Sequence, residues 1–107
     1  MTETLTAALL KCDLADATGL SENCLPLVHD AVEVAATGHG VEAGFPRWEG
    51  DGASAYFLGC DAAARAVRAA LDAVERVRII PGYEVRLRAS VGVGEVQKGA
   101  DLTKVSP

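Results

Sequence analysis

Two aspartates, Asp13 and Asp51, have the residue type and the placement in the chain that metal-dependent phosphate chemistry needs. Asp13 comes near the end of a short apolar run, and Asp51 is the centre of a Gly-Asp-Gly turn. If the strand end and the turn meet in the fold, the two carboxylates repel each other unless a cation joins them. A hard divalent ion such as Mg²⁺ or Mn²⁺ binds carboxylate oxygens and keeps open positions for phosphate oxygens. The pair therefore indicates a site at which a hydroxyl attacks a nucleotide α-phosphate. In the alternative interpretation, Asp13 caps a loop and Asp51 is an ordinary turn residue.

The hydrophobic pattern predicts the elements that would bring these two aspartates together. The apolar run Leu5–Leu14 predicts a buried strand, and the helical spacing that follows predicts a helix from Ser21, its N-cap, to about Thr37. The extended segments Val41–Glu49 and Ala53–Leu58 flank the Gly-Asp-Gly turn and predict a β-hairpin.

The second half of the chain predicts a helix over Ala62–Val77, capped by Asp61, and a last strand over Tyr83–Val96. The helix is expected to bury one apolar stripe on the sheet, made of Ala63, Ala66, Val67, Ala70, Leu71, Val74 and Val77. The order β-α-β-β-α-β predicts an α+β, ferredoxin-like fold with an antiparallel sheet and both helices on one face. In that fold the first strand lies beside the hairpin.

Length and composition restrict the class of protein. The 107 residues are enough for one domain, 1–107, with 97–107 as a tail, and the 50% of hydrophobic residues can form a core. A net charge of −5 argues against binding nucleic acid or a membrane surface through bulk charge. No apolar run of about 20 residues and no basic leader are present, so neither a membrane span nor a signal peptide is expected. Three cysteines without CxxC spacing predict buried, reduced thiols and a cytoplasmic protein.

Four segments resemble, in the same order, motifs of the class III nucleotidyl (adenylate/guanylate) cyclase catalytic domain. Residues 8–22, ALLKCDLADATGLSE, are similar to the first-strand motif D-I/L-x-G-F-T-x-L-S, and residues 47–57, RWEGDGASAYF, to the hairpin motif K-x-x-G-D-G-x-x-A-x-F. Helix 62–77 fits the pattern A-x-x-A-V-x-A-A-L. Residues 85–96, VRLRASVGVGEV, look like L-R-x-R-I-G-x-H-x-G-E-V. The resemblance implies a minimal palm-type domain that transfers a nucleotidyl group from ATP or GTP, releases pyrophosphate and makes a cyclic nucleotide or cyclic oligonucleotide signal.

The resemblance also implies roles for single residues. Asp13 and Asp51 would be the two catalytic metal carboxylates for Mg²⁺ or Mn²⁺, with the Leu14 carbonyl as a further ligand. Arg47 stands where the family often has a purine-reading Lys that is supplied across a dimer, so a homodimer or oligomer is expected. The remaining nucleotide contacts would be the amides of Asp16, Ala17 and Thr18, near the triphosphate.

Departures from the family pattern keep other functions open. Asp16 and Ala17 replace Gly-Phe, and the family's later strand and its helix with an Asn and an Arg do not follow Val96. One alternative is a catalytically incomplete, cyclase-like module for nucleotide binding or dimerisation. Another is a piece whose site is completed by a further segment.

Overall fold

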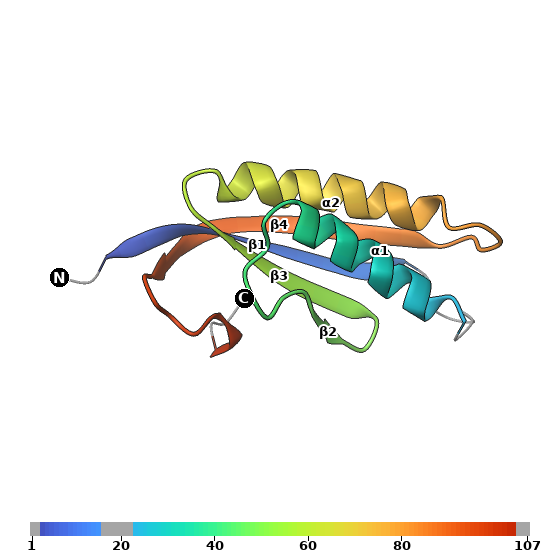
Figure 1. Ribbon diagram of the computed structural model, residues 1–107, viewed down its shortest axis with the longest axis horizontal. Helices are drawn as coiled ribbons and strands as arrows, with labels where there is room; N and C mark the ends of the chain where they lie inside the picture. The colour runs from blue at the N-terminus through green and yellow to red at the C-terminus, as the bar shows by residue number, and fades with distance from the viewer. Residues whose placement is uncertain (1–2, 16–22, 105–107) are drawn as a thin grey trace.

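The computed structural model describes residues 3–15 and 23–104, which form one four-stranded antiparallel sheet with two helices on one face (Figure 1). The strand order is β2-β3-β1-β4, so β2 and β4 are the edge strands. The expected α+β, ferredoxin-like fold is confirmed. The elements are β1 (Thr4–Ala15), α1 (Leu25–Gly38), β2 (Arg47–Glu49), β3 (Gly52–Leu58), α2 (Ala62–Arg78), β4 (Arg86–Gln97) and the short 3-10 helix η1 (Leu102–Lys104).

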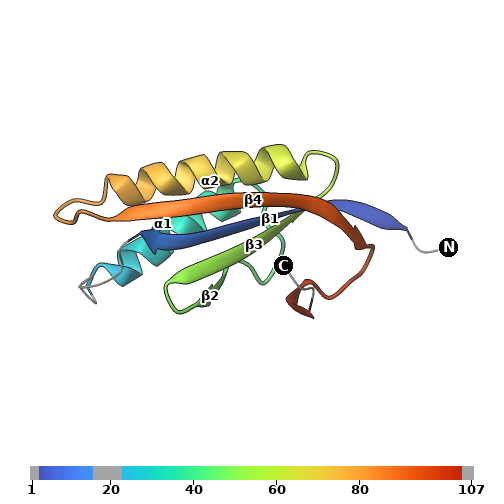
Figure 2. The ribbon, with the colours of Figure 1, turned by 180° about the vertical axis from the view of Figure 1, so that it is seen from behind.

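Alternation along β1 gives the sheet one covered face and one open face. Its even-numbered residues Ala8, Leu10, Cys12 and Leu14 are buried beneath the helices. The odd-numbered Leu9, Lys11 and Asp13 lie on the other face, which neither α1 nor α2 covers; Figure 2 shows the sheet from that side, in front of α1. Because paired residues in an antiparallel sheet point the same way, the register of β1 with β3 and β4 decides which side chains share the open face.

The core beneath the helices consists of two clusters. One contains Phe57 and Leu10, which pack against four alanines of α2. The other contains Val28 and Val32 of α1 together with Val77 of α2. The alanines let α2 approach the sheet closely, so the large side chain of Phe57 is completely buried.

The expected buried stripe of α2 is right for Ala66, Ala70 and Val77, which are buried, and wrong for Val67 and Leu71. Leu71 is 68% exposed and Val67 is 45% exposed. The reason is that apolar residues cover more than half of the circumference of α2, so more than one stripe has helical spacing, and the one made mostly of small alanines fits closest to the strands. The buried residues are Ala62, Ala66, Ala69, Ala70, Ala73 and Val77.

Several helices and strands begin or end at residues other than those expected from the sequence. The first hairpin arm is a strand only over Arg47–Glu49, and the last strand begins at Arg86, three residues after the expected start. Asp61 precedes α2 but makes no side-chain cap; its carboxylate pairs with Arg65 at 3.0 Å, one helical turn later. Helix α1 begins at Leu25, and the expected cap Ser21 lies outside the described residues.

Other features bear on the expectations from composition. Cys12 and Cys24 are buried free thiols as expected, whereas Cys60 is exposed. Burial, and secondarily the negative charge of Asp13, raises the pKa of Cys12 to about 11, so this thiol stays protonated at neutral pH. Neither helix within residues 3–15 and 23–104 is both long enough and apolar enough to span a lipid bilayer.

Candidate functional site

The register of β1 with β3 places Asp13 beside the hairpin turn. Asp13 is the partner of Gly52, the residue that directly follows Asp51. Asp51 itself lies with Gly50 in the turn between β2 and β3, and Gly50 has a φ of 64°, which a glycine adopts without strain. The strand end and the turn therefore meet as the sequence predicts, with the two aspartates on adjacent positions of paired segments.

Asp13 has a cationic partner that the sequence does not reveal. Arg88 of β4 is the residue paired with Asp13 on the other side of β1. Its guanidinium donates two hydrogen bonds to the carboxylate, Nε to Oδ1 at 3.2 Å and Nη2 to Oδ2 at 3.0 Å. Both side chains are about half exposed or more, so solvent screens the pair and its strength is modest. In this state the Asp13 carboxylate is satisfied by arginine.

A groove of about 610 Å³ lies on the open face of the sheet, and Asp13 lines it. Cross-strand rows bring its polar side chains together, because residues paired in register project from the same face. Three basic and two acidic side chains line the groove in a chain of net charge −5, so it is the more cationic part of an acidic protein and favours an anionic ligand. The groove's charged and hydroxyl side chains are Lys11, Arg47, Arg88, Asp13, Glu49, Ser54, Tyr56, Ser90 and Thr103.

Arg47 lines the same groove as Asp13 but from the other edge of the sheet. It is paired with Ser54 on β3, one row away from Asp13. Its Nη1 donates to the backbone oxygen of Thr103, at 3.5 Å, in the segment that follows β4. The hydroxyl and amide of Thr103 lower the pKa of Asp101, and the nearby Arg47 charge lowers it further. Arg47 thus has acidic and carbonyl neighbours from the end of the chain.

Other expected site residues are not brought into this groove. Neither Leu14, whose backbone carbonyl is the expected ligand, nor Asp51 is among the groove's lining residues. The Leu14 side chain is buried on the helix-covered face. Asp16, Ala17 and Thr18, the expected triphosphate contacts, lie outside the described residues.

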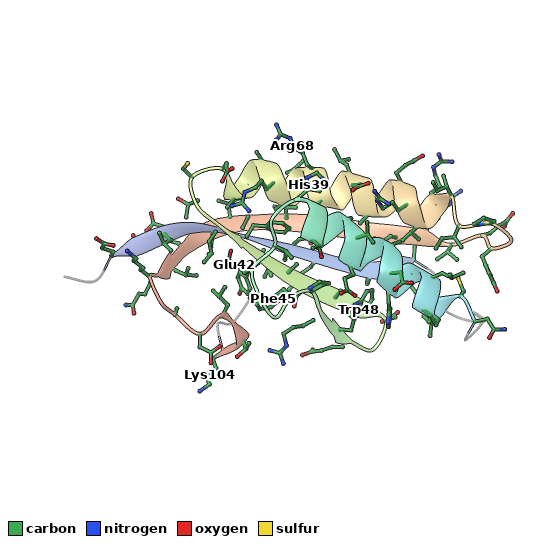
Figure 3. All side chains as sticks on the ribbon, in the orientation of Figure 1. His39, Glu42, Phe45, Trp48, Arg68 and Lys104 are labelled. Atoms are coloured by element: carbon green, nitrogen blue, oxygen red, sulfur yellow. The ribbon has the colours of Figure 1, made fainter. Side chains whose placement is uncertain are left out.

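Trp48 is also absent from the open face. Trp48 pairs with the buried Ala53 and stacks on His29 of α1, with ring centroids 3.9 Å apart. Figure 3 labels Trp48 beside α1. It packs against the core cluster of α1, so it has a structural contact rather than a free face for a base.

Carboxylates are the donors that this end of the sheet offers a divalent cation: Asp13 and Glu49 line the groove, and Asp51 lies in the adjacent turn. Within the described ranges, no group of three or more His, Cys, Asp or Glu side chains could hold a metal ion. Asp13 and Asp51 offer hard oxygen donors from adjacent positions, which fits a cation that takes its remaining ligands from phosphate and water. Arg88 donates to both oxygens of Asp13, so it competes with a cation for that carboxylate.

Solved structures of nucleotidyl cyclases have the same fold as this chain. The guanylyl cyclase Cya2 is 21% identical, with a TM-score of 0.62 over 90% of this chain and 57% of that chain. A bacterial light-regulated adenylyl cyclase is 15% identical, with a TM-score of 0.68 over 90% of this chain and 32% of that one. The adenylyl cyclase CyaB from P. aeruginosa is 15% identical, with a TM-score of 0.65 over 91% and 60%. No protein-family model and no curated protein matches the sequence.

These likenesses confirm the resemblance to adenylyl and guanylyl cyclase catalytic domains at the level of the fold. The chain spans less than two thirds of the length of each of the three cyclases. Since a fold can carry many functions, the likeness determines how the strands are arranged and leaves the chemistry to the side chains at the site.

Proposed function

We propose that this chain binds ATP or GTP together with Mg²⁺ or Mn²⁺ and catalyses nucleotidyl transfer with release of pyrophosphate. The product would be a cyclic nucleotide or a cyclic oligonucleotide signal. The observation that carries the proposal is the β1–β3 register, in which Asp13 pairs with the residue that follows Asp51. The cyclase-like fold and the groove beside this point, which three basic side chains line, support it.

Each group would have a defined task. Mg²⁺ or Mn²⁺, held by Asp13 and Asp51, supplies positive charge at the phosphates when it is bound. Lys11 and Arg47 line the groove and can receive phosphate oxygens or the base. In the transfer, a bond forms between the hydroxyl oxygen and the α-phosphorus, while the bond from that phosphorus to the bridging oxygen breaks. The hydroxyl proton passes to water, and pyrophosphate leaves with the electron pair of the broken bond.

A second candidate is a module that binds nucleotide or a partner without turnover. The observation that favours it is the Arg88 pair, because a carboxylate that already accepts two hydrogen bonds from a guanidinium needs no metal to be satisfied. The assembled state is proposed to be a homodimer or oligomer. The compartment is proposed to be the cytoplasm, in keeping with the free thiols of Cys12, Cys24 and Cys60.

The two candidates are distinguished by incubating the purified chain with α-labelled ATP or GTP and Mn²⁺. Release of pyrophosphate in step with a labelled cyclic product supports the enzyme. A rise in melting temperature with nucleotide and Mn²⁺, without any pyrophosphate, supports the binding module, because a ligand that binds only the folded state stabilises it. If the chain neither releases pyrophosphate nor gains stability with nucleotide and Mn²⁺, both candidates are contradicted.

Arg88→Met is expected to raise the affinity of the chain for Mn²⁺ by up to about fivefold, because it removes the cation that competes for Asp13. Direct titration with Mn²⁺ measures this without nucleotide or turnover. Arg86→Met is the matched control, because it removes the same charge from the same strand. Arg86 pairs with Ala15 rather than with an acid. Equal Mn²⁺ affinities of the two variants would mean that Arg88 does not compete with the metal for Asp13.

A further inference from the structure

The chain after β4 turns back onto the open face of the sheet. We call residues 98–104 the groove strap. Lys98 is fixed beside the start of β1, because its amide donates to the Glu3 carbonyl at 2.8 Å and its ammonium lies 3.2 Å from the Glu3 carboxylate. Gly99, with a φ of 81°, then turns the chain, and Figure 2 shows it running back from the end of β4 to η1. The groove strap is therefore held at its base and changes direction at a glycine.

Leu102 anchors the far end of the groove strap. It is the half-buried residue of η1, whose other two residues are exposed. It lines the groove on the open face together with Leu9, Phe45 and Tyr56, which are the other large apolar residues of the lining. Because a single half-buried leucine removes little apolar surface from water, this anchor is weak.

Asp101 fixes the conformation of η1. Its Oδ1 accepts two hydrogen bonds from Thr103, one from the amide at 3.0 Å and one from the hydroxyl at 2.6 Å, and its carbonyl accepts from the Lys104 amide at 3.0 Å. In this conformation the Thr103 carbonyl accepts a hydrogen bond from Nη1 of Arg47 at 3.5 Å. The Thr103 donors, and secondarily the Arg47 charge, keep the pKa of Asp101 below its ordinary value, so Asp101 is ionised at neutral pH. The groove strap thus presents a carbonyl oxygen and a carboxylate to Arg47.

Arg47 belongs to a row of polar side chains that suits an anionic ligand. Ser54 is paired with Arg47 on one side and with Lys11 on the other, and Lys11 is paired with Ser90 of β4. The row crosses all four strands on the open face and brings two cations and two hydroxyls to the groove. Phosphate oxygens accept hydrogen bonds from such donors, and a guanidinium is among the strongest of them.

The groove strap offers Arg47 the same kind of acceptor that a phosphate would offer. The Thr103 carbonyl already accepts from the guanidinium, and the Asp101 carboxylate supplies the negative charge. A phosphate bound to this row beside Arg47 would also be repelled by Asp101. Since the groove strap and a phosphate use the same donor, binding of one opposes binding of the other.

We propose that the groove strap is an autoinhibitory contact, which has to leave Arg47 before a nucleotide phosphate binds to the row. This inference rests on the proposed function for the identity of the ligand. The contacts that hold the groove strap in place are few: one long hydrogen bond to Arg47, an exposed carboxylate and one half-buried leucine. Gly99 provides the hinge, and the fraction of molecules with a free groove sets the apparent affinity for the ligand.

Asp101→Asn is expected to raise the affinity for ATP with Mn²⁺, and for pyrophosphate alone, by about threefold to fivefold. It removes the negative charge beside Arg47, whereas the oxygen of the Asn side chain still accepts from Thr103. Isothermal titration calorimetry on the full chain measures both ligands. Glu95→Gln is the matched control, because it removes the same charge from an exposed acid that does not line the groove; its affinities should equal those of the wild type.

Leu102→Ser removes the apolar anchor and should raise both affinities by a similar factor. It should also speed cleavage by trypsin after Lys98 and Lys104, the two lysines of the groove strap. Leu27→Ser is the control, since Leu27 is 44% exposed on α1, on the other face of the sheet. In the wild type, saturating pyrophosphate should speed the same two cleavages, although a ligand that only stabilised the fold would slow them.

The outcomes separate the groove strap from the nucleotidyl transfer. Equal or weaker ligand binding by both Asp101→Asn and Leu102→Ser would overturn the proposal, even if the wild type releases pyrophosphate from ATP. So would cleavage of the groove strap that pyrophosphate slows. Tighter binding by both variants without any release of pyrophosphate from ATP would support the groove strap and contradict the transfer. If neither the wild type nor the variants bind either ligand, both proposals are wrong.

Discussion

Asp51→Asn is expected to lower the rate of pyrophosphate release from ATP or GTP by at least ~100-fold, since it removes one of two charged metal ligands. It should also abolish the rise in melting temperature that nucleotide and Mn²⁺ give the wild type. Both effects follow from the proposed site, in which Asp51 lies next to the partner of Asp13. A coupled phosphate assay and thermal unfolding with and without ligand measure them.

The melting temperature of Asp51→Asn without ligand distinguishes a metal-binding role of Asp51 from a structural role in the turn. Asp51 is exposed in the turn, and Asn before Gly suits a tight hairpin, so the apo variant should melt at or slightly above the wild-type temperature. Glu84→Gln is the control, since Glu84 is an exposed acid that does not line the groove; it should keep the ligand-induced rise. If Asp51→Asn lowers apo stability and leaves nucleotide binding unchanged, Asp51 is a turn residue and the enzymatic proposal fails.

Phe57→Ala is expected to lower the free energy of unfolding by about 3–5 kcal/mol, the cost of deleting a large, fully buried side chain. That is a large part of the stability of a small domain, typically about 5–15 kcal/mol. Urea unfolding followed by circular dichroism measures it. Where Phe57→Ala does not fold, Phe57→Leu should show a smaller loss of the same sign.

Leu71→Ala is the matched comparison for Phe57→Ala. Because Leu71 is 68% exposed in the monomer, its truncation should change the unfolding free energy by less than about 0.5 kcal/mol when measured at a concentration where the chain is monomeric. A cost for Leu71→Ala equal to that of Phe57→Ala would show that α2 is rotated so that Leu71 faces the sheet.

The sequence alone predicts the order of the helices and strands and the close approach of Asp13 and Asp51. Alternation along β1 and the Gly-Asp-Gly turn are local patterns, since each depends on neighbouring residues only. Together with the β-α-β-β-α-β order they place the end of β1 beside the hairpin, where Asp13 pairs with Gly52. The local patterns could not predict the short arm at Arg47–Glu49, where the chain before Arg47 leaves the sheet.

Only the tertiary structure determines which residue pairs with Asp13 and which side of α2 faces the sheet. Arg88 is 75 residues from Asp13 along the chain, and only the register of β4 with β1 makes them a pair. The rotation of α2, which buries the alanines and exposes Leu71, likewise follows from how closely a helix can approach the sheet above Phe57. Both results depend on fitting surfaces from distant parts of the chain, and a one-residue slip in register or about 100° of helix rotation leaves the local hydrophobic pattern nearly as good.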